Sequence, residues 1–329
     1  MDPGALEIRP YRPGDETAIN EAFNAVFGLE RSLEEWRWKF RRAPVESPVM
    51  LAWSGEELLA HYAGVPARFQ VDGRTVWAAQ IVDVFSTRRA RRLFARRGVW
   101  VRTVEAFFEA FGESGRFPLL YGFPGRRALR LGLLQLGYGA MEPQPVVVWE
   151  RPAGRRAPSL RRLPYRAEEV AATDPRLDAL WARLRSRYPA AVVRDGERVA
   201  ARLAGRPGVA YRLFLVTPRL SREPVAWVAF RTDGGLVRWA DLVRDPEHPG
   251  ALELAARLGE VLVRQTGAPG ESLWLLGDPG AGEILEALGF RSRPEPNGLV
   301  MVARSFGQGP DVRALEGRVY LTMADSDLV

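Results

Sequence analysis

An arginine-rich turn between an apolar run and an amphipathic pattern is the stretch of this sequence best suited to bind a charged ligand. Residues 81–85 are apolar and β-prone apart from Asp83, and after Gly98 apolar residues recur at helical spacing as far as Phe111. Between them lie several arginines: Arg88, Arg89, Arg91, Arg92, Arg96 and Arg97. The first turn of a helix has unpaired backbone N–H groups and the positive end of the helix dipole. The pattern predicts a site for a phosphate-bearing cofactor, or alternatively a solvated basic surface.

The composition excludes several other kinds of site. The 329-residue chain has no cysteine, so disulfides, thiolate metal sites and cysteine nucleophiles are excluded. Its two histidines, His61 and His248, leave few ligands for zinc, and we predict no metal. The net charge is +7 and the pI about 10.2, which favours anionic partners, from CoA-like cofactors to nucleic acid.

The chain has the composition of a packed protein of about two domains, with 47% hydrophobic residues. Its N-terminus lacks the pattern of a secretory signal or transit peptide, and no apolar run approaches the ~20 residues of a membrane span. We therefore expect a cytoplasmic protein. The use of arginine in place of lysine, with 25 prolines, hints at a thermophilic source.

The spacing of apolar and turn residues in the first half predicts a mixed α/β domain. Ser32 begins the capping-box pattern S-x-x-E at the start of a helix. Ser54-Gly55 and Asp72-Gly73 fit turns between antiparallel strands. The expected elements are a strand at 6–8, a helix at 17–27, a helix after residue 32, strands at 49–53, 58–69 and 74–86, a helix after residue 98, a strand at 118–121, a helix ending near residue 136 and a strand at 146–149.

The second half repeats the first. LGYGAMEPQPVVVWE, beginning at Leu136, returns as LGFRSRPEPNGLVMVA, beginning at Leu288. YGFPG at Tyr121 returns as LGDPG at Leu276, and Asp83 returns as Asp241. Matches in a constant order indicate a duplicated domain. Residues 151–164, rich in Arg and Pro, are predicted to be a linker between domains at 1–150 and 165–329.

These elements and motifs resemble the GNAT acetyltransferase superfamily, arranged in tandem. The first half is similar to a bacterial GNAT branch that carries a W-x-W helix, a strand before a basic CoA loop, and Y-G-F-P-N followed by L-G-aromatic. The corresponding segments begin at Trp36, Asp83, Tyr121 and Leu136. The resemblance implies an α/β fold of two GNAT-like domains, each a twisted mixed sheet flanked by helices.

The resemblance also implies an acetyl-CoA site in the first domain. Carried over residue by residue, it assigns pantetheine to the fourth strand at Val84, Phe85 and Ser86. It assigns the pyrophosphate to the loop before the central helix, at Arg92, Ala95, Arg96, Arg97, Gly98 and Val99.

The sequence departs from the family pattern at several positions. Ala95 and Arg97 replace glycines of the phosphate loop, and Gly125 replaces the asparagine of Y-G-F-P-N. The tyrosine that usually protonates the leaving thiolate is Leu133 in the first half and Leu285 in the second. The second-half loop, which follows Arg244, carries two carboxylates that would repel a pyrophosphate, so we expect no CoA there.

Three side chains are candidates for the proton transfers of acyl transfer. Asp83 on the fourth strand could act as base or be a structural carboxylate. His61 could act as base or be a packed histidine, and Tyr121 could act as acid or be a core tyrosine. Near the C-terminus, Asp325 and Asp327 could attract an amine, although solvation is the favoured reading.

These features favour an acetyl-CoA-dependent N-acyltransferase acting on an amino sugar or another small amine. One alternative is a tandem-GNAT aminoacyl transferase that uses charged tRNA, since the high pI permits nucleic-acid binding. A second alternative is a GNAT-fold binding protein without catalysis, which the leucines at 133 and 285 support.

Overall fold

Both halves of the chain are mixed α/β units, as predicted. The structure, a computed structural model, describes residues 6–93, 98–141, 145–154, 164–232 and 235–327. The first half contains β1 (Leu6–Pro10), α1 (Glu16–Phe27), α2 (Leu33–Arg41), β2 (Val49–Ser54), β3 (Glu57–Val71), β4 (Arg74–Ser86), α3 (Arg88–Leu93), α4 (Val99–Phe107) with a π-helical turn (Phe108–Glu113), β5 (Leu119–Gly122), α5 (Arg126–Gln135), β6 (Gly139–Ala140) and β7 (Val147–Pro152).

Among its described elements, the second half repeats this order without a counterpart of α3 and with two additional strands. It contains β8 (Tyr165–Val170), α6 (Pro175–Leu184), β9 (Ala190–Val192), α7 (Gly196–Leu203), β10 (Tyr211–Pro218), β11 (Ala226–Arg231), β12 (Val237–Arg244), α8 (Pro249–Thr266), β13 (Gly270–Leu276), α9 (Ala281–Ala287), β14 (Arg291–Pro294), β15 (Val302–Ser305) and β16 (Val319–Thr322). The strands β9 and β16 have no counterpart among the described elements of the first half.

Local sequence accounts for the helix limits near the site. The Ser32 hydroxyl accepts a 3.1 Å hydrogen bond from the Glu35 amide, as the capping-box pattern predicted for α2. Gly28 ends α1 with a left-handed φ of 67°, which a glycine adopts without steric cost. The central helix α4 begins directly after Gly98, where the apolar periodicity predicted it.

Each half contributes one of its C-terminal strands to the sheet of the other half. In the first sheet, β15 from the second half lies between β5 and β6. In the second sheet, β7 from the first half lies between β13 and β14. The repeated apolar segments VVVWE and LVMVA therefore occupy equivalent places, each in the other half's sheet.

This exchange corrects the predicted start of the linker. Arg151 and Pro152 belong to β7, and the Arg151 guanidinium is buried in an ion pair with Glu271 of β13 at 2.5 Å. Of the predicted linker, residues 155–163 lie outside the described part of the chain. A domain boundary at residue 150 therefore does not divide the chain into two independent sheets, because each sheet contains a strand from the other half.

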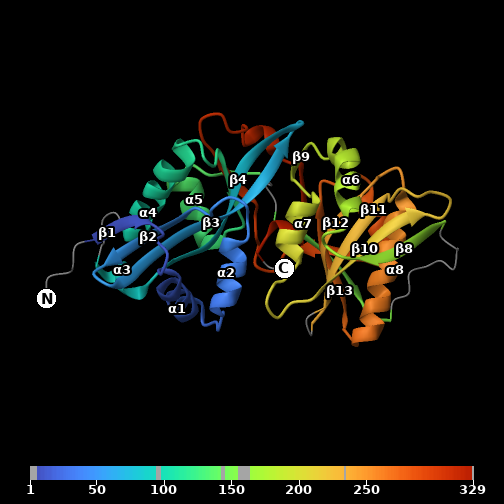
Figure 1. Cartoon of the computed structure of the whole chain (residues 1–329), viewed down its shortest axis with the longest axis horizontal. Helices are drawn as coiled ribbons and strands as arrows, with labels where there is room; N and C mark the ends of the chain where they lie inside the picture. The colour runs from blue at the N-terminus through green and yellow to red at the C-terminus, as the bar shows by residue number, and fades with distance from the viewer. Residues whose placement is uncertain (1–5, 94–97, 142–144, 155–163, 233–234, 328–329) are drawn as a thin grey trace.

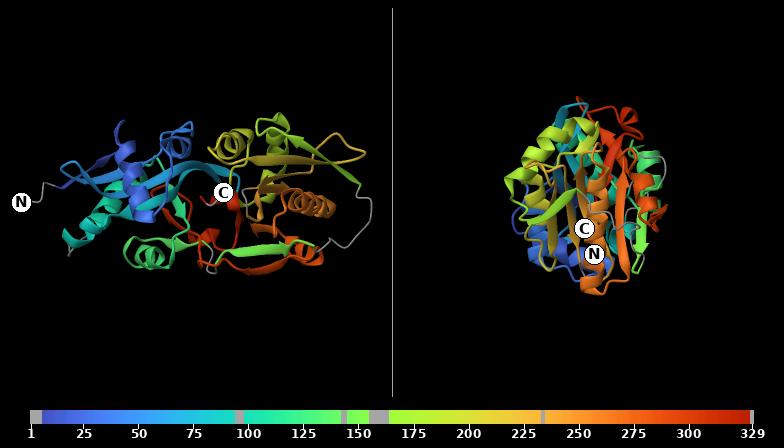
Figure 2. Two further views of the ribbon diagram at one scale, coloured as in Figure 1. Left: turned by 90° about the horizontal axis from the view of Figure 1, so that it is seen from below. Right: turned by 90° about the vertical axis from the view of Figure 1, so that its right-hand side faces the viewer.

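Further pairing joins the two sheets in the middle of the molecule. The long β3–β4 hairpin reaches from the first half to β9 (Figure 1). Strand β9 pairs with β16, and β16 pairs with β13. The largest apolar cluster contains residues of both halves, such as Phe69 and Trp227. The described end of the C-terminal segment lies between the halves of the elongated molecule (Figure 2). Among the described helices, none is long and apolar enough to cross a membrane.

Candidate active site

A β-bulge in β4 opens the first sheet. Strands β4 and β5 pair in parallel only from Ala78 to Ile81 of β4. Beyond this point the β3–β4 register shifts by one residue, and Asp83 has a φ of 52°, a conformation that aspartate tolerates better than most residues. A cavity of about 230 Å³, here called the strand cleft, lies between the ends of the two strands. Its walls include Val84, Gly122, Trp100 of α4 and Leu129 of α5.

His61 supports the bulge instead of facing a substrate. Its side chain is fully buried, stacks on Phe85 at 5.1 Å, and its Nδ1 lies 2.6 Å from the Asp83 carbonyl oxygen. Because a carbonyl only accepts, Nδ1 carries the proton and donates to it. Burial lowers the pKa of His61 to about 4, against the opposing influence of Asp83. The neutral imidazole therefore donates a hydrogen bond to the backbone carbonyl of Asp83, which lies in the bulge.

Asp83 is held as an ionised carboxylate between two cations. Its side chain is 2% exposed and pairs with Arg31 and with Lys39, the latter at 2.6 Å. Burial acts to raise the pKa of Asp83, but Lys39 and Arg31 outweigh it and hold the pKa below its usual value. A carboxylate stabilised in this way is a weak proton acceptor, which favours the structural alternative for this residue.

Tyr121 does not line any of the cavities near the site. It is fully buried, its ring packs on Phe69 with centroids 6.0 Å apart, and burial raises its pKa. Its backbone pairs with Gln80 in β4 and Ala303 in β15. The structure therefore places Tyr121 in the core between the sheets, the alternative that the sequence left open.

The hydroxyls of Tyr62 and Tyr138 meet in the strand cleft. They lie 2.6 Å apart, and they are the hydroxyl-bearing side chains that line this cavity within the described residues. Burial raises the pKa of both phenols. Leu133, where the family tyrosine was expected, is 43% exposed on α5. Sequence reasoning used Tyr138 only as the aromatic of L-G-aromatic and missed its pairing with Tyr62.

The residues assigned to the cofactor fall into three groups. Val84 lines the strand cleft. Phe85 and Val99 point into apolar clusters, so only their backbone could face a ligand, and Ser86 pairs with Ala60 of β3. Gly98 is the N-cap of α4, whose Trp100 reaches the cleft. The Arg92 side chain and Ala95, Arg96 and Arg97 lie outside the described residues.

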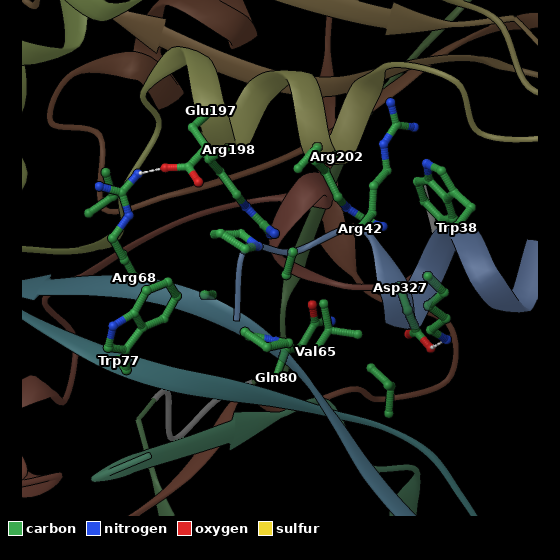
Figure 3. Close-up of a pocket in the computed structure, with 18 residues that line it drawn as sticks. Trp38, Arg42, Val65, Arg68, Trp77, Gln80, Glu197, Arg198, Arg202 and Asp327 are labelled. Carbon is green, nitrogen blue, oxygen red and sulfur yellow. Dashed lines mark hydrogen bonds and ion pairs between the residues drawn. The ribbon is translucent and has the colours of Figure 1, made fainter. Parts of the chain in front are cut away.

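Two further cavities adjoin the bulge on the side facing the second half. The central cavity, about 60 Å³, lies between β4, α2 and α7 and is lined by residues such as Trp38, Trp77 and Arg198 (Figure 3). The helical cavity, about 530 Å³, lies beside Phe27, Arg31 and Arg206.

Asp327 lines the strand cleft, the central cavity and the helical cavity. Its carboxylate is 41% exposed and lies 3.2 Å from Lys39 Nζ. The segment that carries it is held by α7, where Arg202 donates to the carbonyls of Ala324 and Ser326. Asp327 is thus partly solvated, as the sequence favoured, and it also lines the cavities between the halves, which was the other alternative. Asp325 is buried in an ion pair with Arg194 at 2.5 Å and is remote from solvent.

Comparison with known proteins identifies the first half. Residues 7–139 match the family profile described as acetyltransferase (GNAT) domain. This segment is a GNAT domain. It contains the bulged strand, the strand cleft and the tyrosine pair.

Solved structures show the fold of the whole chain. A probable N-acyltransferase from Enterococcus faecalis V583 is 13% identical, with a TM-score of 0.67 over 92% of this chain and 72% of that one. A GCN5-related N-acetyltransferase from Anabaena variabilis is 12% identical, with a TM-score of 0.67 over 92% and 73%. Saccharomyces cerevisiae N-myristoyltransferase, solved with myristoyl-CoA, is 11% identical, with a TM-score of 0.63 over 98% and 90%. The comparison with curated protein sequences gives no match.

The cleft that corresponds to the strand cleft in the second half is filled by the protein itself. Strands β12 and β13 pair only as far as Trp239, so they also diverge after a bulge. Their gap is crossed by tyrosines, because Tyr320 donates to the Leu242 carbonyl at 2.7 Å and Tyr188 to the Arg244 carbonyl at 2.7 Å. In the GNAT domain, the residue that corresponds to Leu242 is Val84, which lines the open strand cleft.

Both bulges carry an aspartate in a charged network. Asp241, the counterpart of Asp83, pairs with Arg194 at 3.0 Å and accepts from the Thr322 hydroxyl at 2.7 Å. The recurrence of a buried, paired carboxylate in a half whose cleft is filled indicates that the aspartate stabilises the bulge. Within the described residues, no three metal-ligating side chains lie together.

Proposed function

We propose that the chain is an acetyl-CoA-dependent N-acyltransferase that acetylates a small amine, with one active site in the GNAT domain. The observation that carries this proposal is the strand cleft, which is open beside the free edge of β4 and meets the other two cavities at Asp327. A thioester entering along β4 and an amine entering from the side of α7 would meet there.

The chemistry requires an attacking amine, a stabilised oxyanion and a protonated leaving thiolate. The amine lone pair attacks the thioester carbonyl carbon, and a backbone N–H at the open edge of β4 would stabilise the resulting oxyanion. Collapse breaks the carbon–sulfur bond, and the Tyr138 hydroxyl donates its proton to the departing sulfur. Asp327 is the better placed base, because it is partly exposed at the junction, whereas Asp83 is fixed between two cations.

The second half would bind no CoA and would instead shape the acceptor side. Its own cleft is filled by Tyr188 and Tyr320, and it supplies Val302 and Asp327 to the walls of the strand cleft. The two-domain division of the chain is thus proposed to separate cofactor binding from acceptor binding.

The proposal is tested by titrating the protein with acetyl-CoA and measuring thiol release with a panel of amines. We expect binding, and we expect Gly132→Leu, which inserts a side chain into the strand cleft beside the Tyr138 ring, to weaken it by at least about tenfold. Leu133→Ala, on the exposed side of the same helix, is the matched control. Absence of acetyl-CoA binding at millimolar concentration would overturn the proposal.

A non-catalytic binding protein is the second candidate, since neither Asp83 nor Tyr121 is free to react. Tyr138→Phe separates the two readings, because removal of a general acid lowers kcat by roughly 10²-fold while leaving acetyl-CoA affinity unchanged. Tyr62→Phe is its partner control, and a smaller decrease is expected because Tyr138 keeps its own hydroxyl. Binding of acetyl-CoA without turnover by any amine would favour the non-catalytic reading.

A further inference from the structure

Three arginines that line the central cavity form no ion pair with a carboxylate of the described residues. They are Arg42 at the end of α2 and Arg198 and Arg202 of α7, here called the arginine triad (Figure 3). The other basic side chains of the central and helical cavities do have carboxylate partners among the described residues: Arg31 and Lys39 pair with Asp83, Arg68 with Asp195, and Arg206 with Glu35.

The triad binds only backbone carbonyls within the described chain. Arg42 donates to the Ala204 carbonyl, and Arg198 and Arg202 each donate to the Ala324 carbonyl at 3.3 Å. A carbonyl oxygen satisfies an N–H donor but carries no net charge to neutralise a guanidinium. Burial, with adjacent Arg198 and Arg206, lowers the pKa of Arg202 to about 10, although Asp327 acts in the opposite direction. The carboxylates of Glu197 and Asp327 also line the cavity, but within the described residues neither lies within ion-pairing distance of the triad, so its guanidiniums are available to an anionic ligand.

The surroundings of the triad have the character of a ligand site. Trp38 and Trp77 lie on different walls of the cavity, the first on α2 and the second on β4 (Figure 3). The Trp38 indole N–H is fixed by the Ala204 carbonyl at 3.3 Å, and the Arg202 guanidinium lies 5.7 Å from its ring centroid. Flat apolar walls beside forked donors are typical of sites for organic anions.

The position of the triad relates it to the proposed acyl transfer. Asp327 lines the central cavity and also the strand cleft, where the thioester is proposed to lie. Gln80 and Val82 of β4 form the floor next to the bulge. A molecule with its amine at Asp327 would extend its other end toward the triad.

We propose that the acceptor is an amine that carries an anionic group, a carboxylate or a phosphate, and that the arginine triad binds this group. The proposal rests on the acyltransferase function proposed above and specifies its substrate class. The triad neutralises the anion and orients the amine, whereas a polycationic acceptor would place further positive charge beside three guanidiniums that have no ion-pair partner in the described part of the chain.

Matched pairs of amines test the proposal. One pair is an α-amino acid and its carboxamide, and the other is an aminohexose phosphate and the free aminohexose. Thiol release with acetyl-CoA is measured for each, together with calorimetric binding to CoA-saturated protein. We expect the anionic member of at least one pair to have a kcat/KM about tenfold or more above its neutral partner, and the pair that shows the difference tells carboxylate from phosphate.

Arg42→Gln is the informative variant, because Arg42 does not hold the segment that carries Asp327. It should raise KM for the anionic member about tenfold and so reduce or abolish the preference over the neutral member. Arg37→Gln, an exposed position on the same helix that lines none of the three cavities, should behave as wild type. Raising the salt concentration should weaken the preference in wild type and not in Arg42→Gln.

The outcomes separate this proposal from the proposed function. Equal or better turnover of neutral or polycationic amines would overturn the anionic acceptor and leave the acyltransferase intact. If no amine is acetylated, the acyltransferase proposal fails and the calorimetric measurements test the triad by themselves. Anion-selective binding that Arg42→Gln abolishes would then support the triad as an anion site. Binding that does not distinguish the members of either pair would overturn the triad proposal.

Discussion

Asp83 is the residue where chemistry and stability are most easily confused. It stands on the bulged strand beside the cleft, as a catalytic base would, but both of its oxygens are engaged by cations. Arg31 and Lys39 are themselves 7% and 14% exposed, so loss of the carboxylate leaves two nearly buried charges without a counterion.

We therefore predict that Asp83→Asn destabilises the protein by about 3 kcal/mol, measured by urea unfolding at pH 7. Asparagine keeps the shape and the tolerance of a positive φ, so the charge alone is removed. Asp327→Asn is the matched control, since its partly exposed pair with Lys39 should contribute less than about 1 kcal/mol. A variant at Asp83 that is as stable as wild type but inactive would show that Asp83 is the base.

The pKa of His61 makes a second prediction at this scale. The pKa of His61 is about 4 in the folded chain, against an ordinary value of 6.5. Between these pH values the unfolded chain therefore binds a proton at this residue that the folded chain does not bind. The stability contributed by the neutral imidazole is fully present above pH 6.5 and is lost as the pH falls toward 4. Between pH 7 and pH 5 the loss is about 2 kcal/mol from this residue.

Urea unfolding at the two pH values measures this loss, and His61→Gln isolates the histidine. Glutamine can still donate to the Asp83 carbonyl but does not titrate, so the difference between pH 7 and pH 5 should shrink by about 2 kcal/mol. An unchanged difference would mean that other groups, such as the carboxylate of Asp83, account for the acid sensitivity.

At the scale of elements, the exchanged strands make each sheet depend on the other half of the chain. β15 lies between β5 and β6, and Ala303 of β15 is fully buried opposite Tyr121. A charge at this position in the second half should therefore disrupt the first sheet.

We predict that Ala303→Asp costs at least about 3 kcal/mol and removes hydrogen-exchange protection from β5, although β5 lies far away in sequence. Ser292→Asp on β14 is the control, because Ser292 is exposed. Loss of protection confined to β13 and β14 would contradict the exchange. The same coupling implies that residues 1–150 alone lack a strand that their sheet requires.

At the scale of the whole molecule, the halves share a fold but differ in what fills their clefts. The first cleft is open, whereas the second is crossed by the hydroxyls of Tyr188 and Tyr320. We predict that isothermal titration gives one acetyl-CoA per chain. The expected stoichiometry should persist in Tyr320→Phe, which removes the hydroxyl but leaves the ring in place. Two equivalent acetyl-CoA sites per chain would contradict the proposal that only the first half binds CoA.

Local patterns in the sequence determined the elements and their duplication. The Ser32 capping box, the Asp72-Gly73 turn and the helical periodicity after Gly98 act over a few residues, so the sequence predicted them, and the GNAT resemblance with its tandem α/β fold was confirmed. The strand exchange could not be predicted in this way, because the apolar segments at 146–149 and 300–303 are alike and either can complete either sheet.

The tertiary structure alone decided the contents of the site. Asp327 looks like a solvated residue in sequence, but guanidiniums of α7 hold the preceding carbonyls and place it where three cavities meet. Tyr62 and Tyr138, distant in sequence, meet because β3 and the turn after α5 face the same cleft. Charge balance in a cavity depends on which side chains share it, and that is a property of packing between distant segments rather than of any local pattern.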